Sequence, residues 1–270
     1  NKLDFLDNQD VTVLCSGPSS NSYMLKTKYI VLCHNAILHN NLNRNNYIIW
    51  VIGLLGNSNF SMWYKLLPTL RILPRIIIVR KFINGNKPDS YKRFNEFYYL
   101  MMQNYPNIKV YLMDHTLDPL CSYSFKLNLE FKFVLSSGME CLRLCLDSNS
   151  RNIFVSGIEM AYNTLYDKSL LSKILVNHTE DSKFNHIAAD VNYLISSYKN
   201  NIIPCKNSGL EKFVKEYLSE SKIINHFKNI NLDHGLDFLY KKDLTILGGS
   251  PYLNLNPNFI KEYVILPNQL

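Results

Sequence analysis

The segment from Phe131 to Tyr166 constrains the fold more than any other part of the chain. An apolar run rich in β-forming residues, Phe131–Leu135, stops at a Ser-Ser-Gly turn, and apolar residues at helical spacing follow over Met139–Leu146. A second apolar run, Asn152–Ser156, ends at another small-residue turn. Strand, turn, helix and strand in this order make a βαβ unit, which belongs to a parallel sheet. The segment therefore predicts an α/β fold.

Other apolar runs of strand length occur on both sides of this unit, and a helical pattern covers Tyr91–Asn104. The additional strands are expected at Val11–Leu14, Tyr29–Cys33, Tyr47–Leu55, Ile76–Val79, Val110–Met113 and Asn201–Cys205. The first three of these runs end in Gly-Pro-Ser-Ser, His-Asn and Gly-Asn-Ser-Asn. Ligands of open α/β sheets bind at the carboxyl ends of the strands, where backbone amides and a helix N-terminus can face a phosphate. We therefore expect the ligand site at the Ser136-Ser137-Gly138 and Ser156-Gly157 turns of the central unit, and the ends of the three other strands support this expectation.

Composition narrows the class of protein. A hydrophobic content of 47% over 270 residues is ample for the core of one large α/β domain. The formal net charge is +7, but no run of Lys and Arg is interleaved with aromatic residues, so a nucleic-acid groove is not predicted. A small anionic ligand or contact with anionic lipid fits the charge better.

The cysteines and the apolar runs bear on location. The six cysteines form no C-x-x-C pair, which favours buried free thiols in a reducing compartment. The most apolar run, Tyr47–Gly56, has half the length that a membrane-spanning helix needs. We predict a cytoplasmic protein. A mixture of basic and apolar residues over 226–242 suggests peripheral contact with the inner membrane.

The chain is expected to divide into three segments. Residues 1–158 form a Rossmann-like nucleotide-binding domain, residues 159–190 a lid rich in polar residues, and residues 191–270 complete the core with extra helices. Asp190 is predicted to cap the helix that follows the lid. His186, at the lip of the lid, is placed to act as a general base, with a structural role as the alternative.

Several motifs together resemble a known family. GPS after the first strand, CHN after the second, SSG before a helix, then FVSGIE, a Tyr/Asn/Ser-rich segment and NHIAAD follow the order found in bacterial sialyltransferases. Over residues 10–208 the sequence resembles the family of lipooligosaccharide α-2,3- and α-2,3/2,8-sialyltransferases. The resemblance implies a modified GT-A fold whose first domain binds a nucleotide sugar. It also implies inverting, metal-independent transfer of sialic acid from a CMP-activated donor to a hydroxyl of a glycan or glycolipid acceptor.

The resemblance also implies roles for individual residues. His186 matches the general base that deprotonates the acceptor. Of two family tyrosines that hydrogen-bond the leaving phosphate, one maps near Tyr166 and the other on Ala161, next to Tyr162. The residues that it places at the donor are Ser16, Gly17, Pro18, Ser19, Asn35 or its neighbour His34, Asn57, Ser136, Ser137, Gly138, Gly157 and Glu159. The implied site needs no metal ion and no cofactor beyond the CMP-sugar, and no DxD motif is present.

Departures from the family pattern leave the transferred sugar open. Cys15-Ser16 stands where the family has Gly-Asn, Val134 where it often has arginine, and Ile187 where serine is usual. A related CMP-activated acid of the pseudaminic, legionaminic or Kdo type is therefore admissible.

Two alternatives from other classes remain. The first is a non-catalytic nucleotide-binding Rossmann module. The second is a transferase that uses S-adenosylmethionine, which is disfavoured because His34-Asn35, rather than an acidic residue, follows the second strand. The sequence leaves the oligomeric state open, a homo-oligomer included. It also leaves open whether LTILGGSP at 244–251, which resembles the opening VTVLCSGP, is an edge element or the start of a second unit of a longer chain.

Overall fold

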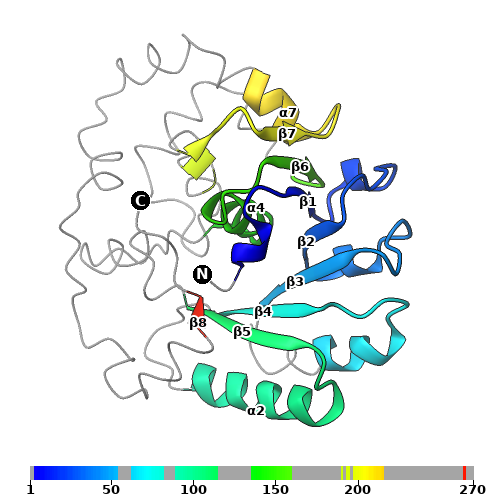
Figure 1. Cartoon of the computed structure of the whole chain (residues 1–270), viewed down its shortest axis with the longest axis vertical. Coiled ribbons are helices and arrows are strands. Elements are labelled where there is room, and N and C mark those ends of the chain that lie inside the picture. The colour runs from blue at the N-terminus through cyan, green and yellow to red at the C-terminus, as the bar shows by residue number, and fades with distance from the viewer. Residues whose placement is uncertain are drawn as a thin grey trace, which may run out of the picture.

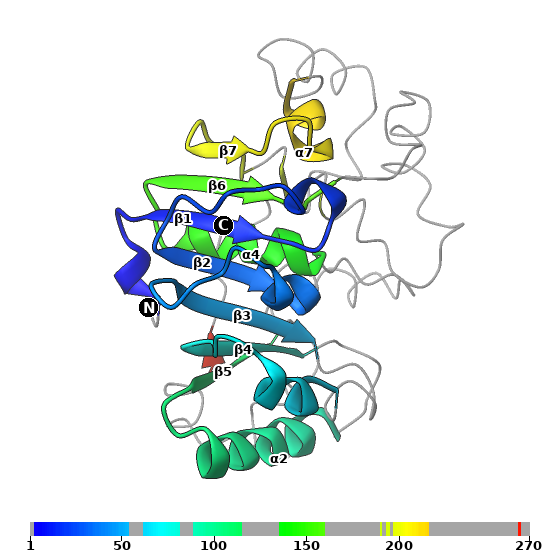
Figure 2. The ribbon, with the colours of Figure 1, turned by 90° about the vertical axis from the view of Figure 1, so that its right-hand side faces the viewer.

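The computed structural model describes residues 3–53, 62–81, 89–114, 135–159, 190, 193–194, 197–215 and 264–265. Its centre is an eight-stranded sheet of order β7-β6-β1-β2-β3-β4-β5-β8 (Figures 1 and 2), in which every neighbouring pair is parallel. The strands are β1 Asp10–Leu14, β2 Tyr29–Cys33, β3 Tyr47–Gly53, β4 Ile76–Lys81, β5 Lys109–Asp114, β6 Asn152–Ser156, β7 Ile202–Pro204 and β8 Val264–Ile265. The sheet confirms the predicted α/β, Rossmann-like class.

Along the described strands, the order first reverses next to β1, and β8 later returns to pair with β5 at the opposite edge. From β1 to β5 each new strand joins the same side of the sheet, whereas β6 returns to pair with the other side of β1. Such a reversal is a topological switch point, where the loops after the two adjacent strands lead to opposite sides of the sheet. Because β1 and β6 are parallel neighbours, the turns that directly follow them lie side by side at the carboxyl edge of the sheet.

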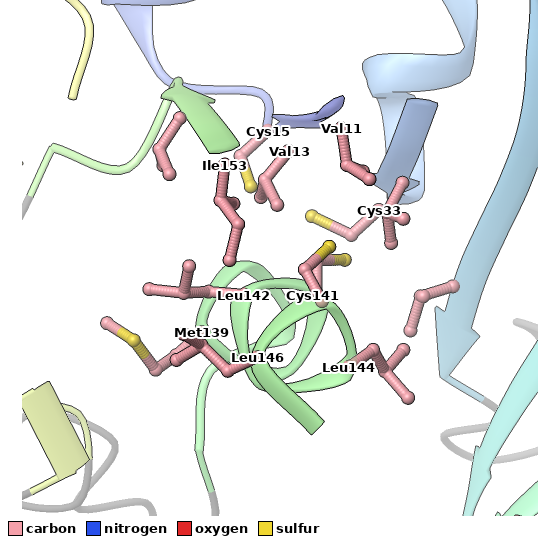
Figure 3. Packing of buried hydrophobic residues seen from close by; sticks show 14 of the residues in the cluster. Val11, Val13, Cys15, Cys33, Met139, Cys141, Leu142, Leu144, Leu146 and Ile153 are labelled. Carbon is pink, nitrogen blue, oxygen red and sulfur yellow. The ribbon is translucent and has the colours of Figure 1, made fainter. Parts of the chain in front are cut away.

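Both faces of the sheet are buried, which explains why its strands read as continuous apolar runs. Alternate residues such as Val13, Val31 and Ile49 belong to one core cluster, together with Met139 and Leu142 of helix α4 (Figure 3). The residues that alternate with them along each strand belong to a second core cluster, which also contains residues of helix α2. The helices are α2 Asp89–Asn104, α4 Ser137–Asp147 and α7 Gly209–Phe213, with 3-10 turns η1 Asp4–Leu6, η2 Pro18–Ser20, η3 His34–Leu38 and η4 Leu67–Thr69.

The start of α4 differs from the expectation. The helix begins at Ser137 instead of Met139, because Ser136 is extended and its Oγ accepts a hydrogen bond from the N–H of Met139 at 3.3 Å. The predicted Ser-Ser-Gly turn is thus a helix cap and the first helical turn. Leu135, the expected end of the preceding strand, is not in a strand, and residues 131–134 lie outside the described residues.

Asp190 also differs from the expectation. It is itself helical, and its Oδ1 accepts a hydrogen bond from the N–H of Ser136 at 2.8 Å. It therefore links the cap residue of α4 to the end of the predicted lid, instead of occupying the cap position of its own helix.

Several predictions fall on other parts of the chain. The lid residues 160–189, with Tyr162, Tyr166 and His186, lie outside the described residues, as do Asn57 and the segments 226–242 and 244–251. Among the helices that the structure describes, none has the length and hydropathy to cross a membrane.

Candidate functional site

The turns after β1 and β6 are joined by a network of hydrogen bonds. Backbone pairing continues past the strand ends, from the N–H of Cys15 to the carbonyl of Ser156 at 2.8 Å and from Gly17 to Gly157 at 3.1 Å. The N–H of Gly157 in turn donates to Ser19 Oγ at 3.0 Å. The two turns, although far apart in sequence, therefore form one rigid unit at the switch point.

Two glycines make this close approach possible. Gly157 has φ +80°, and a Cβ there would lie 2.2 Å from the carbonyl oxygen of Cys15. A Cβ at Gly17 would lie 2.5 Å from the carbonyl oxygen of Gly157. A side chain at either position would force the turns apart, which is why the sequence has glycine at both.

Glu159 links the turn after β1 to the start of helix α7 through hydrogen bonds. Its Oε1 accepts a hydrogen bond from the N–H of Ser19 at 2.6 Å, and its Oε2 accepts one from the N–H of Gly209 at 3.2 Å. Gly209 is the first residue of α7, so the carboxylate also lies at a helix N-terminus. In this structure Glu159 fixes two loops. The ribose contact implied by the resemblance stays a prediction.

A second group of polar residues surrounds the start of α4. Ser137 Oγ lies 2.6 Å from His34 Nε2 and accepts a hydrogen bond from Arg80 at 2.5 Å. A Cβ at Gly138 would come within 2.9 Å of Cys15 Sγ, so the start of α4 packs directly against the turn after β1. The two groups therefore form a single candidate site at the carboxyl edge.

His34 is held firmly in an uncommon backbone conformation. Its φ is +48°, a value that non-glycine residues adopt mainly at special sites. Its carbonyl accepts a hydrogen bond from Trp50 Nε1 at 2.9 Å, and its ring stacks on Trp63 at 5.5 Å. Burial lowers the pKa of His34, the nearby Cys33 opposes this effect, and the Arg80 cation lowers the pKa further. The imidazole is therefore neutral at physiological pH.

The structure distinguishes between the two residues proposed after the second strand. His34 reaches Ser137, whereas Asn35 is exposed on η3. Of the other predicted donor residues, Ser16 and Pro18 are exposed, and Gly17, Ser19, Ser136, Ser137, Gly138 and Glu159 are half-buried. The turns after β1 and β6 and the start of α4 thus lie close together with His34, and donor binding by Asn35 or His34 stays a prediction.

Sequence reasoning missed the role of Arg80. This side chain follows four buried residues of β4, is 0% exposed, and also donates to the carbonyl of Leu135 at 2.6 Å. Burial lowers the pKa of Arg80, and the charge of Glu140 opposes that effect. The available signal was an arginine directly after an apolar strand, at the edge where the ligand turns were expected.

A cluster of thiols lies beneath the site (Figure 3). Cys15 directly follows β1, Cys33 ends β2 and Cys141 belongs to α4, and their side chains point toward one another. All three are free and buried, as is Cys145, which confirms the prediction of buried thiols for these positions. Burial raises the pKa of Cys141, so this thiol packs as a small apolar side chain.

Within the described ranges, no group of three or more His, Cys, Asp or Glu side chains is arranged to hold a metal ion. Comparisons with protein-family models, with curated proteins and with solved structures find no match to this chain.

Proposed function

We propose that the chain is a glycosyltransferase that moves sialic acid, or a related nonulosonic acid, from a CMP-activated donor to a hydroxyl of a glycan or glycolipid acceptor. One observation carries the proposal. The turns that the sequence motifs assign to the donor, at Ser16–Ser19, Ser136–Gly138 and Gly157–Glu159, converge at the switch point of a parallel sheet. Nucleotides bind open α/β sheets at such points.

The chemistry of these residues suits a phosphate-linked donor. Ser137 and Gly138 are the first two residues of α4, where backbone N–H groups and the helix dipole favour an anion. The rigid turns after β1 and β6 would position the nucleotide beside them. Fixed donors aimed at the developing phosphate charge typically contribute a few kcal/mol each to transition-state stabilisation.

The remaining parts of the mechanism belong to the same proposal. His186 would take the proton of the acceptor hydroxyl, and Tyr162 and Tyr166 would hydrogen-bond the leaving phosphate, within a modified GT-A fold closed by a lid. The reaction would invert the anomeric centre without a metal ion. We place the enzyme in the cytoplasm, with peripheral contact at the inner membrane for a lipid-linked acceptor.

Thermal unfolding in the presence of nucleotides tests the donor class. A ligand at 100 times its Kd stabilises the native state by about 2.7 kcal/mol, which raises Tm by several degrees in a domain of this size. We expect a rise with CMP and none with UMP, GDP or S-adenosylmethionine. A rise in Tm with one of the other nucleotides, or no rise in Tm with any of them, would contradict the proposal.

Transfer from CMP-sialic acid tests the base. His186→Ala should retain the CMP-induced rise in Tm and lose about 10²- to 10⁴-fold in transfer rate. His39→Gln is a matched control for the loss of a histidine, since His39 Nε2 donates to the carbonyl of Ser20 at 2.7 Å and no step of the proposed transfer is assigned to it. Binding of CMP without any transfer by the wild-type chain would favour the non-catalytic nucleotide-binding module.

A further inference from the structure

His34, Ser137 and Arg80 form a hydrogen-bonded group, and the Ser137 hydroxyl and the His34 imidazole take no part in the chemical steps of the proposed transfer. A guanidinium can only donate, so Ser137 Oγ must accept from Arg80 Nη1. The hydroxyl proton of Ser137 is then free to point at His34 Nε2, 2.6 Å away. A neutral imidazole with its proton on Nδ1 accepts that hydrogen bond, which gives a serine hydroxyl directed at a histidine base.

The opposite arrangement is less consistent with the contacts. If His34 Nε2 carried the proton, Ser137 Oγ would accept two hydrogen bonds, and its own proton would find no acceptor among the contacts described for it. Burial and the Arg80 cation both disfavour a protonated imidazole. The stacking of the ring on Trp63 and the hydrogen bond from Trp50 fix the position of His34.

We propose that Ser137 is an activated nucleophile, with His34 as the base that takes its proton and Arg80 as the positioning residue that orients its hydroxyl. A serine and a histidine within hydrogen-bond reach are the two parts that nucleophilic catalysis needs. Ser137 also opens α4, so the helix dipole stabilises negative charge that develops on Oγ. Ser137 and His34 are both half-buried, which leaves part of the pair accessible.

The substrate class that fits this pair is a carboxylic ester. Ser137 Oγ forms a bond to the carbonyl carbon while its proton passes to His34 Nε2. The ester C–O bond then breaks, and His34 returns the proton to the leaving alkoxide. Water attacks the acyl-serine by the reverse proton path, which releases the acid and restores Ser137. The Gly138 N–H, at the second position of the helix, is available to the developing oxyanion.

An alkyl fluorophosphonate tests the nucleophile without any knowledge of the natural substrate. Serine attack forms an Oγ–P bond and expels fluoride, and the proton passes to His34. We expect the folded wild-type chain to gain one adduct by intact mass, mapped to Ser137 by peptide sequencing. A folded wild-type chain with no adduct at Ser137 would overturn the proposal.

Variants separate the roles of the three residues. Ser137→Ala should lose the adduct, and His34→Gln should label at least about 100-fold more slowly. The matched controls are Ser22→Ala, at an exposed serine, and His39→Gln, and both should label at the wild-type rate. Labelling of a folded His34→Gln variant at the wild-type rate would also overturn the proposal.

The pH profile of labelling tests Arg80. The rate should rise with pH as His34 loses its proton, and Arg80→Met should move the midpoint to higher pH, because the nearby cation is gone. An unchanged midpoint in a folded variant would remove Arg80 from the mechanism. The proposal that Ser137 is a nucleophile stands independently of the proposed transferase activity. Slower labelling of Ser137 in the presence of CMP would support a donor site there. Labelling in the absence of CMP supports the nucleophile whether or not CMP protects it.

Discussion

At the scale of single residues, the site depends on charged and polar side chains that are kept away from water. Arg80 and Asp190 are both buried, and each is hydrogen-bonded to the segment that opens α4. A buried ionisable group either finds partners or shifts its pKa toward the neutral form. Asp190 does both, so its protonation should affect stability in the physiological range.

We predict that Asp190 makes the protein less stable as pH rises toward neutrality. Burial raises the pKa of Asp190 to about 7, although its hydrogen bonds to Ser136 and the charge of Arg80 lower it. An unfolded Asp titrates near 3.9. Between these values the folded state holds a proton that the unfolded state has lost, so the free energy of unfolding falls from about pH 4 to about pH 7 and is level above.

Urea unfolding of the wild type and of Asp190→Asn at several pH values checks this prediction. The amide cannot ionise, so the variant should lack the part of the slope that Asp190 causes, and other titrating groups cancel in the difference. Parallel stability curves for the two proteins would contradict the raised pKa.

At the scale of elements, α4 is the helix on which the site depends. Its inner side packs against β1, β2 and β3, and its first turn carries Ser136, Ser137 and Gly138. The cap fixes where the helix begins, and therefore where Ser137 meets His34 and Arg80.

Removal of the cap should destabilise the protein by about 1 kcal/mol. Ser136→Ala loses the side-chain acceptor for the N–H of Met139, whereas Ser136→Thr keeps a hydroxyl and serves as the control. The two variants are compared by their midpoints in urea. Equal midpoints for Ser136→Ala and the wild type would show that the cap contributes nothing.

The sequence predicted elements well where burial alone determines them. β2 and β6 have the predicted bounds, because an apolar run buried on both faces leaves little choice of structure. The start of α4 was missed because a Ser-Ser-Gly sequence is compatible with either a turn or a capped helix, and tertiary contacts select between them. Likewise, the position of Arg80 after an apolar run is compatible with a surface cation as well as with a site residue, and only the fold shows that its side chain reaches Ser137.

At the scale of the whole molecule, stability should be highest in the middle of the sheet. The core side chains of β2 and β3, such as Val31, Leu32, Ile49 and Trp50, are fully buried, and both strands pair on each side. β7 is three residues long and includes the exposed Ile203. Amide protection follows local opening, which is rarest in such a centre.

Hydrogen exchange followed by mass spectrometry should therefore give the slowest exchange in β1, β2 and β3 and faster exchange in β7. Peptides that cover 29–33 and 202–204 make the most direct comparison. Equal protection of these two peptides would mean that the sheet opens only as a single unit.

The pairing of β1 with β6 has a consequence for biosynthesis. Asp10 and its hydrogen-bond partner Asn152 are 142 positions apart. At the usual speed of translation, the ribosome needs on the order of ten seconds to make the intervening chain. Throughout that interval β1 presents an unpaired, strongly apolar edge, which is a template for association with other chains. The newly made protein should therefore depend on a chaperone that covers this edge until β6 emerges.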